Sequence, residues 1–189
     1  MKTTTLAQIK SLGPNKHKWE QLLSGLGKTE ADTEKIPYSR ILEIRGLYWT
    51  LWTTKTEDSL RWVSELALVY ARHVAHFMLD PRSINALNVA DQFLYGQASW
   101  DELSQAIDDA DNADYAGPAV CAASAVLCFR GHHRTALFTA DTAEEAASLV
   151  FAHKASEASR YDEAAKAEAI AAFDAERKWQ EQEFLRVVS

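Results

Sequence analysis

Cysteine, proline and glycine are scarce in this chain. Its 189 residues include 2 Cys, 4 Pro and 7 Gly. So few turn-forming residues argue against a loop-rich β sandwich or barrel. Two cysteines make no disulfide framework, and on one helix Cys121 and Cys128 would stand roughly 10 Å apart, too far for a bridge. A reduced, cytoplasmic setting is therefore expected.

Long apolar runs and excess positive charge are missing too. The longest nearly apolar stretch, 119–129, is far shorter than the roughly 20 residues that cross a bilayer. The first five residues lack the apolar core of a signal peptide. The formal net charge of −7 argues against direct binding to nucleic acid or to a membrane surface. At 47% hydrophobic and 25% charged the chain is typical of a soluble globular protein, and its acidic charge favours a basic protein partner.

What the chain has in abundance is helical periodicity. After Asn15, a candidate N-cap, apolar residues follow i, i+3, i+4, i+7 spacing. A long apolar stripe predicts one helix from about 59 to 79, and Asp80 with Pro81 starts the next. Ser99 and Glu102 form a capping box at the start of another helix. The sequence therefore predicts an all-α protein of stacked antiparallel helices, as a bundle or a short solenoid-like array.

The composition divides the chain into three parts. Residues 1–27 are predicted to form a helical hairpin that packs on the main bundle or reaches a partner, and the polar residues 28–37 a linker. Residues 38–189 form the main alanine-rich helical domain. Within it Gly46 is a candidate helix stop. We interpret the aromatic segment 47–54 as a helix, with a short strand as the alternative.

The second half of the chain is rich in alanine. Gly117 and Pro118 divide one predicted helix from the next. The capping pattern at 141–145 predicts the N-terminus of a further helix, and the last helix is predicted from about 162 to 188. Small residues let helices approach closely, and they suit a homodimer face as well as contacts within the chain.

Three tryptophans, Trp49, Trp52 and Trp62, cluster beside the apolar stripe of the helix at 59–79. We expect all three to be largely buried and to anchor the early helices on that helix. Replacing Trp52 by Ala would then cost about 3–5 kcal/mol of stability.

Acidic residues gather on the helix that follows Ser99. One side of it carries four aspartates, Asp101, Asp108, Asp109 and Asp111, here called the acidic ridge. No Lys or Arg lies among them. We predict that the ridge binds a basic surface of a partner protein, where it would imitate a phosphate backbone. The alternatives are a site for a divalent cation and a solvated helix face. Asp114 would fall on the apolar side, so either the helix ends before it or its carboxylate is partly buried.

A cationic cluster follows the central helices. It consists of Arg130, His132, His133 and Arg134. Because Arg offers a bidentate fork to phosphate or carboxylate, the cluster is a candidate anion site. The alternative is a helix C-terminus decorated with cations, which the helix dipole favours.

His73 and His76 lie three residues apart, a spacing that can place two imidazoles on one metal. Zinc sites need three or four ligands, however, and no further Cys or His lies at a suitable offset. We therefore predict no metal site and no cofactor. No phosphate-binding loop, nucleophile elbow or Cys-x-x-Cys motif occurs, which favours a binding protein over an enzyme. A metal-binding helical bundle or an enzyme that uses the two histidines and dispersed carboxylates is the alternative.

Several passages resemble one family. They are residues 39–47, 71–76, 80–87, 96–103 and 179–180. The passage 96–103 resembles the family's "GxAsxeeL" turn. This is a family of alanine-rich helical immunity proteins of bacteria and their phages, and the likeness covers about residues 36–185. The resemblance implies an immunity or inhibitor protein that acts by occupying a partner protein, and it carries no catalytic residues over to this chain.

Overall fold

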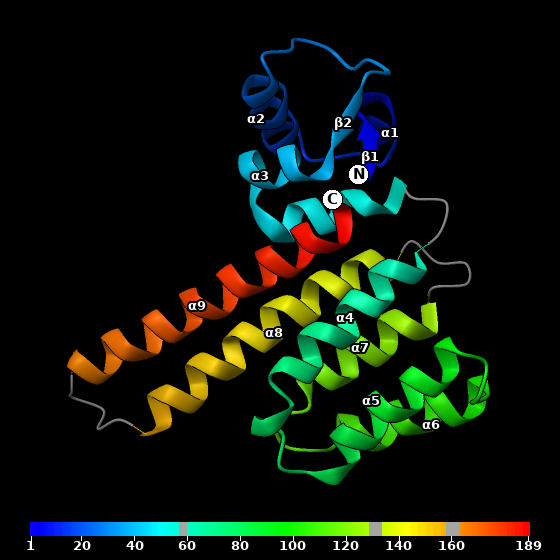
Figure 1. Ribbon diagram of the computed structural model, residues 1–189, viewed down its shortest axis with the longest axis vertical. Coiled ribbons are helices and arrows are strands. Elements are labelled where there is room, and N and C mark those ends of the chain that lie inside the picture. Colours follow the sequence, from blue (N-terminus) through cyan, green and yellow to red (C-terminus); the bar gives the residue numbers. More distant parts are fainter. Residues whose placement is uncertain (57–59, 129–133, 158–162) are drawn as a thin grey trace.

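The structure is a computed structural model that describes residues 1–56, 60–128, 134–157 and 163–189. Within these residues, nine α-helices and one two-stranded sheet confirm the all-α prediction (Figure 1). The first four helices are α1 (Leu6–Ser11), α2 (Lys16–Leu26), α3 (Tyr38–Thr53) and α4 (Arg61–His73). The others are α5 (Pro81–Leu94), α6 (Trp100–Asp111), α7 (Gly117–Cys128), α8 (Arg134–Glu157) and α9 (Glu163–Val188).

A short antiparallel sheet, which the sequence pattern did not predict, closes the N-terminal part. β1 (Thr3–Thr5) pairs with β2 (Lys35–Pro37), with Thr4 opposite Ile36. The end of the segment interpreted as a linker is therefore a strand. Strands of three residues are too short to show an alternating pattern. Between the strands lie α1 and α2, and Asn15 caps α2 as predicted.

α3 bends at Gly46. The φ of 73° and ψ of 172° at this residue lie outside the helical region. Glycine adopts such a backbone without a Cβ clash, so the bend confirms Gly46 as a helix stop. After the bend the chain is helical again as far as Thr53, which confirms the helical interpretation of this segment. A 3-10 turn, η1 (Thr54–Thr56), follows.

The helix predicted from about 59 to 79 is shorter than expected. α4 ends at His73, and a 3-10 turn, η2 (Ala75–Phe77), continues the chain. Val74 and Met78 are buried, so the apolar stripe runs on past the end of the helix. Over a single turn, apolar spacing cannot distinguish an α-helix from a 3-10 turn.

Buried residues gather in two clusters. The first, here called the aromatic core, joins the N-terminal part to α9 and includes Leu6, Tyr38, Trp49, Tyr70 and Phe184. The second, here called the alanine core, lies among α4 to α8 and includes Leu103, Ala119, Ala122, Ala123 and Val126. α4 contributes to both clusters, because Tyr70 belongs to the aromatic core and Ala71 to the alanine core.

α8 is one continuous helix of 24 residues, so the helix N-terminus predicted at 141–145 is wrong. The capping residue types there make contacts across helices instead. Asp141 accepts a hydrogen bond from the Tyr48 hydroxyl at 3.4 Å, and Glu144 pairs with Arg177 at 2.8 Å. These partners lie on α3 and α9, so the local sequence gives no sign of them.

α8 and α9 form a long antiparallel hairpin whose far end projects from the body of the protein (Figure 1). The prediction of a long last helix is confirmed by α9. α9 runs back to the N-terminal part, where the Val188 carbonyl accepts a hydrogen bond from the Lys2 amide at 2.7 Å. The two ends of the chain therefore lie side by side.

Of the three tryptophans predicted to be largely buried, only Trp49 is, at 5% exposed. Trp52 and Trp62 are half-buried. Trp52 stacks on Trp49 with ring centroids 5.6 Å apart, and Trp62 contacts both the Phe184 ring and the ammonium group of Lys2. Both half-buried rings therefore sit at the edge of the aromatic core, with one part of each in solvent.

Candidate functional site

α6 buries one side and presents the acidic ridge on the other. Leu103, Ala106 and Ala110 face α5 and α7 and are buried. All four aspartates of the ridge are exposed. The predicted division of this helix into an apolar and an acidic side is therefore confirmed, while the binding of a partner remains a prediction.

The capping box at the start of α6 is confirmed. The Ser99 hydroxyl accepts a hydrogen bond from the Glu102 amide at 3.2 Å, and the Glu102 carboxylate accepts one from the Ser99 amide at 2.7 Å. Hydrogen bonds from the Ser99 backbone and hydroxyl lower the pKa of Glu102. Glu102 therefore holds the helix end and is not a free member of the acidic surface.

A groove of about 510 Å³ lies between α5 and α6. It is lined by Asn85, Val89, Gln92, Ala98, Asp101, Glu102, Gln105, Ala106 and Asp109. Asp101 and Asp109 border this groove, whereas Asp108 and Asp111 do not. The structure thus divides the ridge into a groove side and an outer side.

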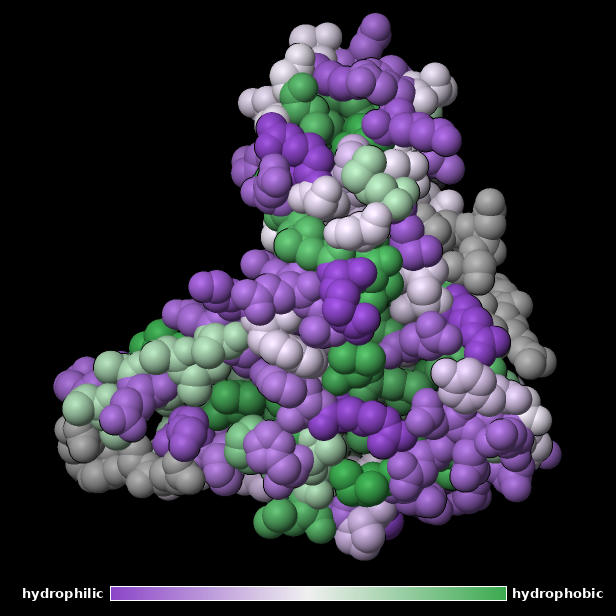
Figure 2. Space-filling model, in the orientation of Figure 1, coloured by the Kyte–Doolittle hydropathy of each residue, from purple (hydrophilic) through white to green (hydrophobic). Residues whose placement is uncertain are grey.

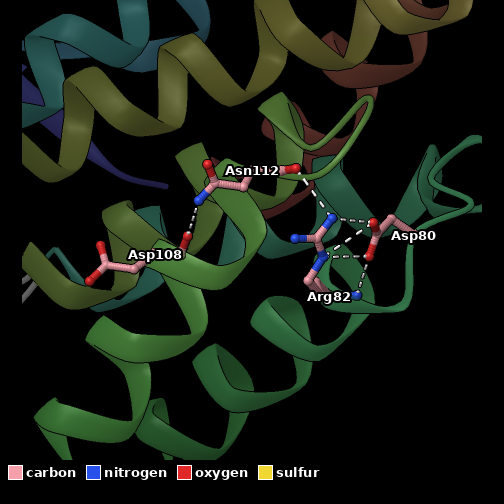
Figure 3. A network of polar contacts seen from close by, with 4 residues as sticks. All are labelled: Asp80, Arg82, Asp108 and Asn112. Carbon is pink, nitrogen blue, oxygen red and sulfur yellow. Dashed lines mark hydrogen bonds and ion pairs between the residues drawn. The ribbon is translucent and has the colours of Figure 1, made fainter.

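A cation from α5 lies near the end of the ridge. Arg82 Nη2 donates to Asp80 Oδ2 at 2.6 Å and to the Asn112 carbonyl at 3.2 Å, so it joins the start of α5 to the end of α6 (Figure 3). The hydrogen bond with Asp80 raises the pKa of Arg82 most, and the nearby charges of Asp109 and Asp114 raise it further. The ridge has no cation in its own segment, yet the fold brings one beside Asp109.

Asp108 is one of the two aspartates of the ridge that do not line the groove. Figure 3 shows its carboxylate directed away from Arg82, while its backbone carbonyl accepts a hydrogen bond from the Asn112 side chain at 3.1 Å. α6 ends at Asp111, and Asp114 beyond it is exposed. Of the two alternatives for Asp114, the helix has therefore ended before it.

The cationic cluster falls largely outside the described residues, which exclude Arg130, His132 and His133. Arg134 is the first residue of α8 and is exposed. Burial raises the pKa of Cys128, and the charge of Arg134 offsets part of that rise. The anion site proposed for this cluster remains a prediction.

His73 and His76 contact different groups. His73 Nδ1 lies 2.8 Å from Glu176 Oε2, and its ring stacks on Trp179 with centroids 3.6 Å apart. His76 packs against Phe77, with centroids 3.9 Å apart. Among the described residues, no group of three or more His, Cys, Asp or Glu side chains is arranged to hold a metal ion.

Glu176 is a buried carboxylate that the sequence analysis missed. Its side chain is 4% exposed, and besides His73 it receives a hydrogen bond from Gln180 Nε2 at 3.0 Å. Gln180 Nε2 also donates to the Ala143 carbonyl, and the Tyr70 hydroxyl donates to the Gln180 carbonyl, each at 3.0 Å. Because a buried carboxylate is costly unless it is hydrogen-bonded, we interpret this network as a structural link among α4, α8 and α9. The four-residue spacing of Glu176 and Gln180 was the one local signal of it.

The two cysteines are free, as expected, and both lie on α7. Burial, with smaller contributions from Asp141 and Glu145, raises the pKa of Cys121 to about 12. A thiol with so high a pKa stays protonated at neutral pH and is a poor nucleophile and metal ligand.

Comparison of the chain with protein-family models, with curated proteins and with solved structures finds no match. The resemblance to the alanine-rich immunity proteins therefore stays a prediction. Among the described helices, none has the length and apolar character needed to span a membrane.

Proposed function

We propose that this is a non-enzymatic binding protein that occupies a basic segment of a partner protein with the acidic ridge and the groove beside it. One observation carries the proposal. Four exposed aspartates project from a helix whose opposite side is buried, and two of them border a groove. A helix anchored in this way holds its carboxylates in place before a partner arrives, which lowers the cost of binding.

The groove suits the side chains of Lys and Arg. Asp101 and Asp109 are eight residues apart, about 12 Å along the helix axis. Val89, Ala98 and Ala106 contribute apolar surface to the same groove. An aliphatic Lys or Arg stem can lie on this surface while its charged end meets a carboxylate. An extended basic segment would reach both carboxylates with residues about four apart, at ~3.3 Å per residue.

The outer carboxylates, Asp108 and Asp111, have a different part in the proposal. Because they face away from the groove, they act over a distance and mainly speed the encounter with a basic partner. Salt screens this effect, since the Debye length is ~8 Å at physiological ionic strength.

The biological role that fits this binding is that of an immunity or inhibitor protein of bacterial or phage origin. The negative net charge of the chain and its resemblance to the alanine-rich family support this role. A basic protein that handles nucleic acid would be a natural target, with the carboxylates in the place of phosphates.

Two double variants with the same change in charge test the proposal. One is Asp101→Lys with Asp109→Lys, on the groove side, and the other is Asp108→Lys with Asp111→Lys, on the outer side. The probe is an immobilised arginine peptide with basic residues four apart, and association and dissociation are followed at low and high salt. We expect the groove-side variant to bind at least about tenfold more weakly, mainly through faster dissociation. The outer variant should only associate more slowly, and only at low salt.

The control is Glu168→Lys with Asp174→Lys, two exposed acids on α9. Its net charge changes equally, so it should bind the peptide much as the wild type does. Circular dichroism melts check that all three variants keep the fold, because exposed substitutions usually change stability by under ~0.5 kcal/mol. If all three lose binding to the same degree, the ridge is only a solvated acidic face and the proposal fails.

A further inference from the structure

A second groove follows α4, on another side of α5 from the groove beside the acidic ridge. Its volume of about 410 Å³ lies within the ~300–1,000 Å³ typical of small-molecule sites. Side chains of α4, the end of α5 and the last turns of α9 form it, here called the α4 groove. Figure 2 shows hydrophobic surface over α4, with strongly hydrophilic side chains around it. The residues that carry the argument are Trp62, Glu65, Val69, Asp91, Tyr95 and Arg186.

Two aromatic side chains line the α4 groove. The Arg61 guanidinium lies over the Tyr95 ring, 5.2 Å from its centroid, and Tyr95 is 62% exposed. The Trp62 ring packs against Phe184, but its Nε1 atom is buried and donates to no described residue. Because a buried N–H without an acceptor costs free energy, a ligand that supplies an acceptor is favoured there.

Cations gather at the end of the groove where Trp62 lies. The Lys2 ammonium group is 4.9 Å from the centroid of the Trp62 ring, and it forms no ion pair with a described residue. Arg186, on the last turns of α9, has a side chain that is 65% exposed and pairs with Glu183 at 2.8 Å. Lys2 is joined to the same end of α9 through the Val188 carbonyl. This end therefore attracts an anionic group such as a phosphate.

The α4 groove also offers hydrogen-bond acceptors. Glu65 Oε1 accepts from Arg61 Nε at 3.0 Å. Asp91 Oδ2 accepts from Arg72 Nη2, also at 3.0 Å. These pairs hold both carboxylates in place. Among the described residues, no donor meets the second oxygen of either one, so both can accept from N–H groups of a ligand.

We propose that the α4 groove binds a guanine nucleotide. The flat base stacks on the Tyr95 ring, as bases do on aromatic side chains. Its N1 and N2 donors meet the free oxygens of Asp91 and Glu65, and the phosphate lies near Lys2 and Arg186. A mononucleotide needs only these local cations, whereas the negative net charge of the chain opposes a long polyanion. The site is independent of the partner proposed for the acidic ridge.

The two carboxylates select guanine over adenine. Adenine has an acceptor at N1, where guanine has a donor, so beside a carboxylate it would bring two acceptors together. Isothermal titration of the full chain should give a dissociation constant for guanosine monophosphate (GMP) on the order of 10–100 μM. Adenosine monophosphate (AMP) should bind at least about tenfold more weakly. A wild type that binds no GMP at ~1 mM, or binds AMP as tightly as GMP, would overturn the proposal.

A larger side chain in the groove tests the location. Val69→Trp should abolish GMP binding, because the indole would occupy the space of the base. Val89→Trp is the matched control, since Val89 is also a half-buried valine but lines the groove beside the acidic ridge. It should bind GMP as the wild type does, and circular dichroism melts check that both variants fold. GMP binding that survives Val69→Trp, or that both variants lose equally, would refute this site.

Two further variants separate the phosphate from the base. Arg186→Ala should weaken GMP about tenfold and leave guanosine, which has no phosphate, unchanged. Arg40→Ala is the control, because Arg40 also pairs with an acid three residues away, and it should change neither. Asp91→Asn should weaken GMP more than AMP and so narrow the preference between them. If Arg186→Ala weakened GMP and guanosine equally, or Asp91→Asn left the preference unchanged, the assigned contacts would be wrong.

Discussion

The aromatic core and the alanine core are both buried between helices, yet different physical terms hold them together. Tyr38 and Phe184 are fully buried and bring together segments from opposite ends of the chain. In the alanine core Ala119, Ala122 and Ala123 are also fully buried, but each contributes little area. There the helices gain stability by approaching one another closely, which gives many atomic contacts per residue. The comparison predicts that one core is most sensitive to smaller side chains and the other to larger ones.

The largest effect is expected from Phe184→Ala. The ring is fully buried and lies edge-on to Tyr38, with centroids 6.5 Å apart. Its loss should lower the free energy of unfolding by about 3–5 kcal/mol in urea denaturation. The sequence alone predicted a loss of about 3–5 kcal/mol for Trp52→Ala as well. Because the Trp52 side chain is only half-buried, we now expect a smaller loss for that variant. If Phe184→Ala cost no more than Trp52→Ala, the fully buried ring would contribute no more to stability than the half-buried one, and the prediction would be wrong.

Ala122→Leu should break the other core. The added carbons have no space between helices that meet at fully buried alanines, so we expect a loss of about 1–3 kcal/mol in the same measurement. Ala171→Leu adds the same group to an exposed position on α9 and should change stability by under ~0.5 kcal/mol. A fully stable Ala122→Leu protein would show that the alanine core contains voids.

The smallest effect concerns a polar contact beside the alanine core, between Asp80 and Arg82. The hydrogen bond from the Arg82 side chain, with one from its backbone, lowers the pKa of Asp80 to about 2. Since the folded-state pKa lies below the ordinary value of ~3.9, the ionised carboxylate stabilises the fold above about pH 4. This stabilisation is lost as the pH falls toward 2.

Asp80→Asn should therefore flatten the decline of stability between about pH 4 and pH 2, and high salt should reduce the difference from the wild type. Urea denaturation of both proteins across this range measures it. Parallel curves for the two proteins at low salt would mean that Asp80 is not the group responsible.

The sequence predicted much of the candidate site. The capping box of Ser99 and Glu102 placed the start of α6, and helical spacing placed the aspartates opposite Leu103. The sequence of α6 could not predict that the ridge has a groove side and an outer side, because the other wall of the groove belongs to α5. Arg82 likewise lies far from Asp109 in the sequence, so only packing brings it near.

The burial of Glu176, in contrast, could not be predicted from the sequence. Acidic residues are almost never fully buried unless they are paired, so a sequence gives no reason to place one in the interior. Its partner His73 is on α4, and the fold decides their contact. The three-residue spacing of His73 and His76 therefore gave no sign that His73 contacts the Glu176 carboxylate.

The sequence by itself determined the helices of this protein and most of their ends. Caps such as Asn15, Asp80 and Ser99 act within a single turn, and apolar spacing acts within a single helix. Both therefore depend only on residues that are close in the sequence. Only the tertiary structure decided that α8 continues through 141–145. There the partners of Asp141 and Glu144 come from α3 and α9, and contacts between distant segments depend on how the helices pack rather than on neighbours in the chain.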